Sequence, residues 1–184
     1  LKGLDISFDK SLVINMGTGS QIITQIKSIE KNKFEKRSYF DNEVLDVFTH
    51  FPCGRAISIY INILNNESST DYWKELNKLN IKDILSSEPV NLSIFKSAEN
   101  YKKIKSEDFC NNTYSENIIL LNGLMKSLVM QYETAIKEAQ LSIDVNKIFL
   151  AGGVAHKLDF IEDLFENYYC IKTEKIYRED ETIL

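Results

Sequence analysis

The sequence predicts an α/β fold in which antiparallel strands come first and parallel strands follow. Three observations support this prediction. A strand pair surrounds the turn Gly-Thr-Gly-Ser within residues 11–27, a long periodic helix is expected at 114–140, and a short strand at 148–150 turns through two glycines into another helix. Strands joined by a short turn pair antiparallel, whereas strands separated by a helix pair in parallel. The 184 residues are enough for one domain with a sizeable core.

Composition and charge argue against several classes of function. The formal net charge is −5, so neither nucleic acid nor an anionic membrane surface is an expected partner. No apolar run approaches the roughly 18 residues that span a bilayer. Three cysteines at wide spacing and two histidines indicate reduced thiols and no zinc site. We therefore expect a cytoplasmic protein without a metal site built from its own side chains.

The first part of the chain predicts a hairpin followed by a further strand. Residues rich in Ile and Val flank the turn at 17–20, which predicts two antiparallel strands. The charged segment 27–37 is typical of a solvated loop or a strand end. Residues 43–51 alternate in polarity and predict another strand, which Pro52 ends.

The middle of the chain predicts helices and one irregular excursion. Residues 53–64 are β-branched, which favours a strand, but Pro-Cys-Gly-Arg is typical of a helix start, and we favour a helix. Cys53 is interpreted as a small buried side chain and not as a reactive thiol. Residues 68–80 offer a Ser or Thr N-cap and apolar residues at spacings of four and three, which predict a helix. Residues 83–112 are polar and irregular, with room for a short strand.

The last part of the chain predicts alternating helices and strands. Residues 114–140 carry the most regular helical stripe of apolar side chains. Gly123 interrupts this stripe at a cost of about 1 kcal/mol relative to alanine, so a packing or ligand reason is expected. Then follow a strand at 148–150, a turn at Gly152 and Gly153, a helix, a last strand at 170–177, and the start of another helix at 178–184.

Two glycine turns carry the functional signal of the sequence. A tight hairpin turn needs glycine for its backbone angles, but it does not also need Thr18 and Ser20. Backbone amides beside two hydroxyls suit the terminal phosphate of a nucleotide and its metal-bound water. At Gly152 and Gly153 the backbone allows a ligand to approach closely. Each turn alone is also explained as an ordinary tight corner, and only the pair favours nucleotide binding.

The order of these motifs resembles the second, C-terminal lobe of the FGGY carbohydrate kinases. The motifs are NMGTGSQ, PCGRA, LLNGLMKSL, IFLAGGVAHK and EDET, and together they extend over residues 12–182. The first two look most similar to the sedoheptulokinase-type branch, with the xylulokinases as a second type. The resemblance implies a ribonuclease H-like domain of the actin and hexokinase superfamily, with a mixed sheet flanked by helices.

The resemblance also implies ATP and Mg²⁺ as cofactors and a set of ten binding residues. In such kinases the hairpin faces the β- and γ-phosphates, the second glycine turn lies against the adenosine, and two further segments border the cleft or lie near it. In that order, the corresponding residues here are Gly17, Thr18, Gly19 and Ser20; Gly152, Gly153 and Ala155; Gly54 and Arg55; and Gly123.

A further implication is that residues 1–184 form a single domain, the ATP-binding lobe of a two-lobe sugar kinase. In FGGY kinases the catalytic aspartate lies in a Gly-Asp motif shortly before the phosphate hairpin, and no such motif precedes Leu12. We therefore expect no catalytic residue here, an inactive chain when alone, and a sugar that binds through the absent N-terminal lobe. The alternative is a non-catalytic, actin-like nucleotide-binding or interaction module. An exposed apolar cleft face would favour a homodimer.

Overall fold

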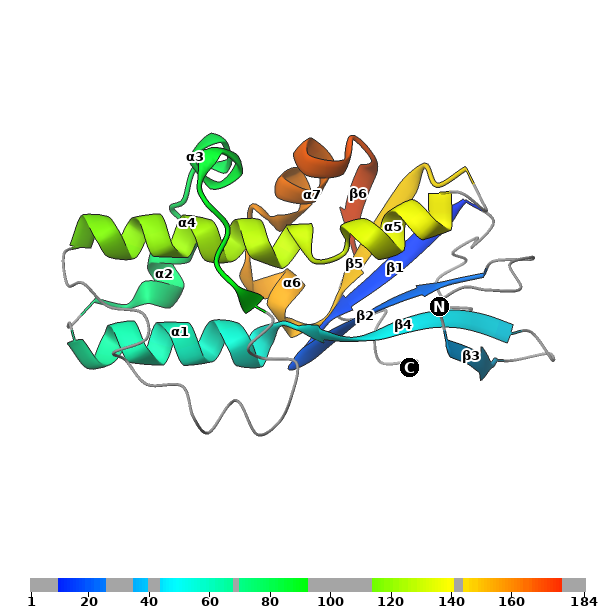
Figure 1. The fold of residues 1–184 in the computed structure, drawn as a ribbon, viewed down its shortest axis with the longest axis horizontal. Helices are drawn as coiled ribbons and strands as arrows, with labels where there is room; N and C mark the ends of the chain where they lie inside the picture. The colour runs from blue at the N-terminus through cyan, green and yellow to red at the C-terminus, as the bar shows by residue number, and fades with distance from the viewer. Residues whose placement is uncertain are drawn as a thin grey trace.

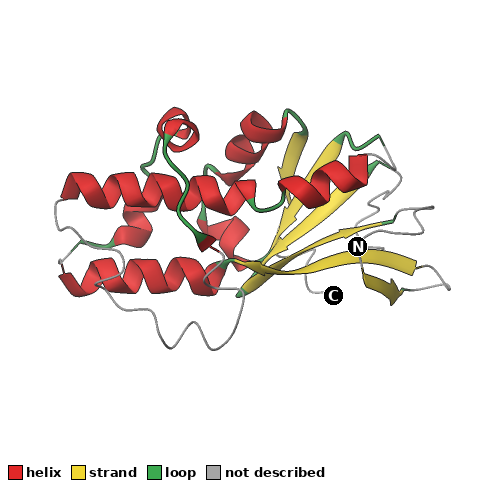
Figure 2. Cartoon of the chain, in the orientation of Figure 1, coloured by secondary structure: helices red, strands yellow, loops and turns green. Residues whose placement is uncertain are grey.

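The computed structural model describes residues 10–25, 35–39, 44–67, 70–92, 114–140 and 144–176. Within these segments, six strands form one mixed sheet in the order β3-β4-β2-β1-β5-β6 (Figure 1). The helices lie mainly toward one end of the sheet (Figure 2). The α/β class predicted from the sequence is confirmed.

The sheet has an antiparallel half and a parallel half. In chain order its strands are β1 (Ser11–Met16), β2 (Gly19–Thr24), β3 (Glu35–Ser38), β4 (Val44–Pro52), β5 (Lys147–Ala151) and β6 (Lys172–Lys175). β1 pairs antiparallel with β2, β2 with β4, and β4 with β3, whereas β5 pairs in parallel with both β1 and β6. All four residues of β3 are exposed, so the charged segment predicted as a loop or strand end contains an edge strand.

The described segments contain seven helices. They are α1 (Gly54–Glu67), α2 (Tyr72–Leu76), α3 (Ile81–Ser86), α4 (Tyr114–Met130), α5 (Glu133–Gln140), α6 (Gly153–Lys157) and α7 (Ile161–Tyr169). The helix favoured after Pro52 is confirmed as α1. Its side chains at helical spacing, Ile57, Tyr60, Ile61 and Leu64, are all buried, and this packing outweighs the strand propensity of the isoleucine-rich segment.

Two predicted helices are each divided in the structure, and one helix was missed. The helix expected at 114–140 divides at Gln131 and Tyr132, where the Tyr132 amide donates to the Val129 carbonyl in place of the carbonyl four residues back. The helix after the second glycine turn divides at Leu158, whose backbone is extended. Helix α3 was missed within the excursion, although the Asn80 side chain caps it by accepting from the Lys82 amide.

Other differences are at the edges of elements. The helix expected at 68–80 is shorter, and its N-cap residue is Asp71, not a Ser or Thr. The rest of the excursion, 93–112, and the helix start expected at 178–184 lie outside the described residues. Within the described part of the chain, no helix is long and apolar enough to cross a membrane.

Strand β1 is at the centre of the core. Leu12, Ile14 and Met16 pack on one face with side chains from α1, α4 and α7, and all three are fully buried. Val13 lies on the opposite face, in a smaller apolar cluster with Leu45 of β4. Side chains therefore cover both faces of β1. This packing fixes the position of the strand end from which the β1–β2 turn starts.

Candidate functional site

The two glycine turns predicted to act together lie at the same edge of the sheet. β1 and β5 are adjacent and parallel, with Asn15 opposite Ala151. The β1–β2 turn and Gly152 therefore follow the carboxyl ends of neighbouring strands, the usual place for ligands in open α/β sheets. The glycine at 152 has φ of +92°, and a side chain there would lie 2.7 Å from the Met16 carbonyl oxygen. This position requires glycine for both conformation and space.

The tip of the β1–β2 hairpin is fixed by the start of α1. The Gly17 amide donates to the Gly19 carbonyl at 3.0 Å, which closes the turn. The amides of Gly54 and Arg55 donate to the carbonyls of Gly17 and Thr18 at 3.0 and 2.9 Å. These two amides of α1 are therefore not available to a ligand. Their role is to hold the backbone of the hairpin in position.

Three segments meet closely at Gly54. A Cβ atom there would lie 2.7 Å from the Gly17 carbonyl oxygen and 2.9 Å from Val154 Cγ2. Any side chain would push the hairpin and α6 away from α1. Gly153 is different, because its Cβ would meet no atom within 4 Å. Gly54 is thus needed for the close packing of the site, and Gly153 faces open space.

A cavity of about 550 Å³ opens where these segments meet. Its volume lies in the range of small-molecule sites. Five of the ten predicted binding residues line it: Gly17, Thr18, Gly54, Arg55 and Gly153. Four more residues complete the lining: Ser58, Trp73, Val154 and Lys157. The structure therefore brings residues of both glycine turns into one cavity with residues that the motifs did not identify.

Ser20 does not line this cavity. Its side chain is buried, and its Oγ accepts a hydrogen bond of 2.8 Å from the Tyr132 hydroxyl. Burial, and then the nearby Cys53, raises the pKa of Tyr132 well above its usual range, so its hydroxyl stays protonated and can donate. Ser20 thus ties β2 to the turn between α4 and α5.

The remaining four predicted residues, Gly19, Gly123, Gly152 and Ala155, also do not line the cavity and have roles in the fold. Gly19 starts β2, Gly152 forms the turn, and Ala155 is fully buried. At Gly123 a Cβ would lie 2.4 Å from the Glu88 carbonyl oxygen. The close approach of residues 88–90, just after α3, explains this glycine without a ligand.

Cys53, beside the site, is a buried thiol. Burial raises its pKa to about 12, and the polar contacts with the Gly54 backbone and the Tyr132 side chain offset this only in part. The thiol is therefore protonated at neutral pH, which makes it a poor nucleophile. This agrees with its interpretation as a small buried side chain.

Trp73 and Lys157 are notable cavity residues outside the ten predicted ones. Lys157 ends the motif IFLAGGVAHK, whereas Trp73 lies in none of the motifs. The Lys157 ammonium lies 4.9 Å from the centre of the Trp73 ring, a cation–π contact between α6 and α2. One signal in the sequence pointed to Trp73: it lies off the stripe of Tyr72 and Leu76, so its large aromatic side chain is not expected to be fully buried.

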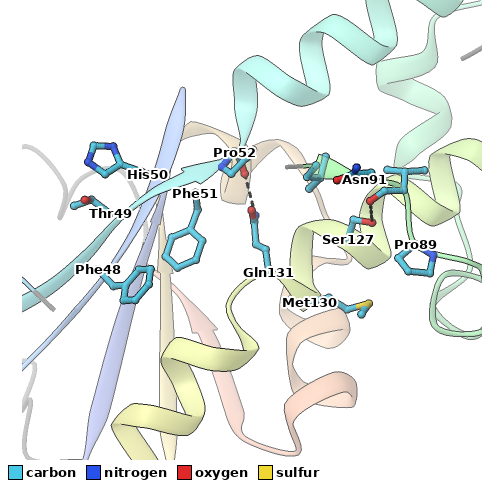
Figure 3. A pocket seen from close by; sticks show the side chains of 12 residues that line it. Phe48, Thr49, His50, Phe51, Pro52, Pro89, Asn91, Ser127, Met130 and Gln131 are labelled. Carbon is cyan, nitrogen blue, oxygen red and sulfur yellow. Dashed lines mark hydrogen bonds between the residues drawn. The ribbon is translucent and has the colours of Figure 1, made fainter. Parts of the chain in front are cut away.

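A second cavity, of about 510 Å³, lies between the end of β4, residues 89–92 and the end of α4 (Figure 3). Much of its lining is apolar, including Phe48, Phe51 and Met130. Figure 3 shows Gln131 reaching toward β4, where its Nε2 donates to the Pro52 carbonyl at 2.9 Å. This cavity contains none of the ten predicted residues.

The lining of the first cavity suits an anion better than a free metal ion. Its described residues include the cations Arg55 and Lys157 and no carboxylate. Nowhere in the described segments do three or more His, Cys, Asp or Glu side chains gather as metal ligands would. Mg²⁺ fits this site as an ion carried by phosphate oxygens, which is how it commonly binds with nucleotides.

The sequence matches no protein-family model and no curated protein. The structure does match solved structures. A gluconate kinase from Lactobacillus acidophilus aligns with 95% of this chain at 13% identity and a TM-score of 0.65. The chain has the fold of part of a sugar kinase. A Plasmodium falciparum glycerol kinase solved with ADP aligns with 96% of the chain at 11% identity and a TM-score of 0.59.

A third match is an activator protein rather than a kinase. The activator of the 2-hydroxyisocaproyl-CoA dehydratase from Clostridium difficile, solved with ADPNP, aligns with 95% of this chain at 16% identity and a TM-score of 0.51. The chain spans 37% of the length of the gluconate and glycerol kinases and 57% of the activator. The predicted ribonuclease H-like fold class is confirmed, and sugar kinases are among its matches, as the motif order implied.

Proposed function

We propose that this chain is the ATP-binding half of an FGGY carbohydrate kinase. The observation that carries the proposal is the cavity at the sheet edge, where the β1–β2 turn, the start of α1 and the start of α6 meet. The likeness in fold to sugar kinases supports it, as does the ADP in the glycerol kinase structure.

The residues of the cavity suit a nucleoside triphosphate. The Thr18 hydroxyl can donate to a phosphate oxygen, and Arg55 brings a planar cation that binds phosphate through two N–H groups. Gly153 leaves its part of the wall open, which lets a ligand lie against the backbone. In the proposed complex the phosphates lie at Gly17 and Thr18, and Mg²⁺ is bound to their oxygens.

The proposed reaction is transfer of the ATP γ-phosphate to a sugar hydroxyl. Phosphoryl transfer depends on positioned phosphates, charge stabilisation and a base in line with the acceptor. The described lining supplies the first two and no carboxylate to act as the base. We propose that the base and the sugar site belong to a second lobe, and that the 184-residue chain alone does not phosphorylate sugars.

A nucleotide-binding module without kinase activity is the second candidate. The activator match supports it, because a protein that is described as an activator and was solved with ADPNP shares this fold. The reading frame of the gene distinguishes the two candidates. A continuous frame that encodes a second lobe with a Gly-Asp motif before the hairpin supports the kinase, and its absence supports the module.

Isothermal titration of MgATP into the chain tests the proposal. The chain should bind MgATP at millimolar concentration or below, and Gly153→Val should weaken this binding at least about tenfold by filling the cavity. The valine meets no neighbouring atom at its Cβ, so the melting temperature should not fall. Gln140→Val, at an exposed position on α5, adds the same side chain outside the cavity and should bind like wild type.

Two results would overturn the proposal. One is a folded wild-type chain that shows no saturable binding of MgATP, ADP or ADPNP. The other is a Gly153→Val variant that binds MgATP as tightly as Gln140→Val does.

A further inference from the structure

Trp73 and Lys157 occupy the part of the cavity that lies away from the β1–β2 turn. Ser58 is four residues beyond Gly54 along α1, about 6 Å at the helical rise, and it also lines the cavity. In Figure 1, α2 lies farther along α1 from the β1–β2 turn than α6 does. The cavity therefore extends from the glycine turn, past α6, to the aromatic ring of Trp73.

The ring of Trp73 is held in a fixed place relative to α6. The Asn77 Nδ2 group, just after α2, donates to the Lys157 carbonyl at 2.9 Å. The Asp159 amide donates to Asn77 Oδ1 at 3.0 Å. These two bonds, made by one side chain, join α2 to the end of α6. Trp73 is half buried and packs against the core, so its ring is a preorganised surface.

We propose that Trp73 and Lys157 bind the base of the nucleotide whose phosphates lie at Gly17 and Thr18. The inference rests on the proposed function and assigns the base to named side chains. A nucleobase stacks well on an indole ring, whichever base it is. Lys157 is exposed, and lysine has a flexible four-carbon stem. Its ammonium can therefore leave the ring face and donate to a nitrogen of the base or to a ribose hydroxyl.

The alternative explanation of the same contact is purely structural: Lys157 and Trp73 only stabilise the packing of α2 against α6. The two explanations differ in what they predict for a ligand without a base. Inorganic tripolyphosphate has the phosphates of ATP and no base. If Trp73 contacts the base, its loss weakens ATP binding and leaves tripolyphosphate binding unchanged. If it only supports the fold, its loss weakens both or neither.

The chain itself provides a direct signal, because Trp73 is its single tryptophan. Stacking of a base on the indole should quench or shift the tryptophan emission when MgATP or MgADP is added. Magnesium tripolyphosphate should leave the emission unchanged. This measurement on the unmodified chain does not depend on how any variant folds.

Three variants complete the experiment, each titrated with MgATP and with magnesium tripolyphosphate by calorimetry. Trp73→Leu should lose at least about fivefold in ATP affinity, the lower limit for one stacked base. Trp73→Phe keeps an aromatic ring and should bind ATP more tightly than Trp73→Leu. Lys157→Gln, at an exposed position, should weaken ATP binding with no change in melting temperature. Both Trp73 variants should bind tripolyphosphate as wild type does.

The outcomes separate failure of this inference from failure of the proposed function. If wild type binds neither ligand, the proposed function fails and the inference fails with it. If wild type binds both and Trp73→Leu binds ATP as tightly, or loses both ligands equally, only the inference is overturned. Equal wild-type affinity for ATP and tripolyphosphate would likewise overturn it, because the base would then contribute nothing.

Discussion

Two single side chains, Gln131 and Tyr132, help to hold the strands near the candidate site in place. Tyr132 donates to Ser20, and Gln131 donates to the Pro52 carbonyl, so one turn between α4 and α5 contacts both β2 and the end of β4. The motifs pointed to Ser20 as a phosphate ligand, because a hydroxyl in a glycine turn suits that role. The tertiary partner of that hydroxyl comes from a residue 112 positions away, which no local pattern reveals.

Two buried acidic groups predict how stability depends on pH. Burial raises the pKa of Cys53 from 9.0 to about 12 and that of Tyr60 from 10.0 to about 12. Because the folded pKa values exceed the unfolded ones, the stability from keeping these groups protonated is complete below pH 9. It is lost as the pH rises from 9 toward 12. Urea unfolding at a series of alkaline pH values should therefore show a falling free energy of unfolding.

Cys53→Ala provides the matched control for this prediction. It removes the group that titrates first in the unfolded chain, so the free energy of unfolding should fall less steeply between pH 9 and 10 than in wild type. A wild-type free energy of unfolding that stays constant from pH 8 to 11 would contradict the account.

The elements show which parts of a fold local sequence can specify. The hairpin, β4 and β5 were predicted because apolar residues there are bounded by Gly or Pro. The helix α1 was predicted from its Pro-Cys-Gly-Arg start, and α4 from its apolar stripe. The interruption at Gln131 and Tyr132 was not, since the apolar stripe continues through it, with Ile136 and Ala139 buried on α5 as Leu128 is on α4. At this division the side chains of Gln131 and Tyr132 form hydrogen bonds to other elements. The periodicity of the sequence cannot predict such bonds.

Gly123 gives a prediction at the scale of helix packing. Alanine is better than glycine in a helix by about 1 kcal/mol, so an uncrowded Gly123→Ala would stabilise the protein. Here the new Cβ would lie 2.4 Å from the Glu88 carbonyl oxygen and 3.3 Å from Val90 Cγ1. We expect a loss of about 1–3 kcal/mol in the free energy of unfolding, measured with urea.

Gly153→Ala is the control for that substitution. It also replaces a helical glycine, but its Cβ meets nothing within 4 Å, so its free energy of unfolding should stay the same or rise slightly. Stabilisation by Gly123→Ala would show that residues 88–90 do not crowd this helix.

The whole molecule explains why half of the predicted site could be found from sequence. Motif order identified the backbone turns at the ends of β1 and β5, and the parallel pairing of those strands brings the turns together. The side chains opposite the turns could not be found in this way. Trp73 lies on α2, which Asn77 joins to the end of α6 through a contact between residues 80 positions apart. At 11–13% identity, the gluconate and glycerol kinases share the fold without specifying these side chains.

The central claim is that nucleotide binds in the cavity between the two glycine turns. Amide chemical shifts recorded during titration with MgADP test it most directly, because the 21.3 kDa chain is small enough for residue-by-residue observation. The amides of Gly17, Thr18 and Gly153 should shift with one common saturation curve, while Asn91 and Ser127 in the second cavity should not move. Shifts centred on Asn91 and Ser127, or none at saturating MgADP, would contradict the claim.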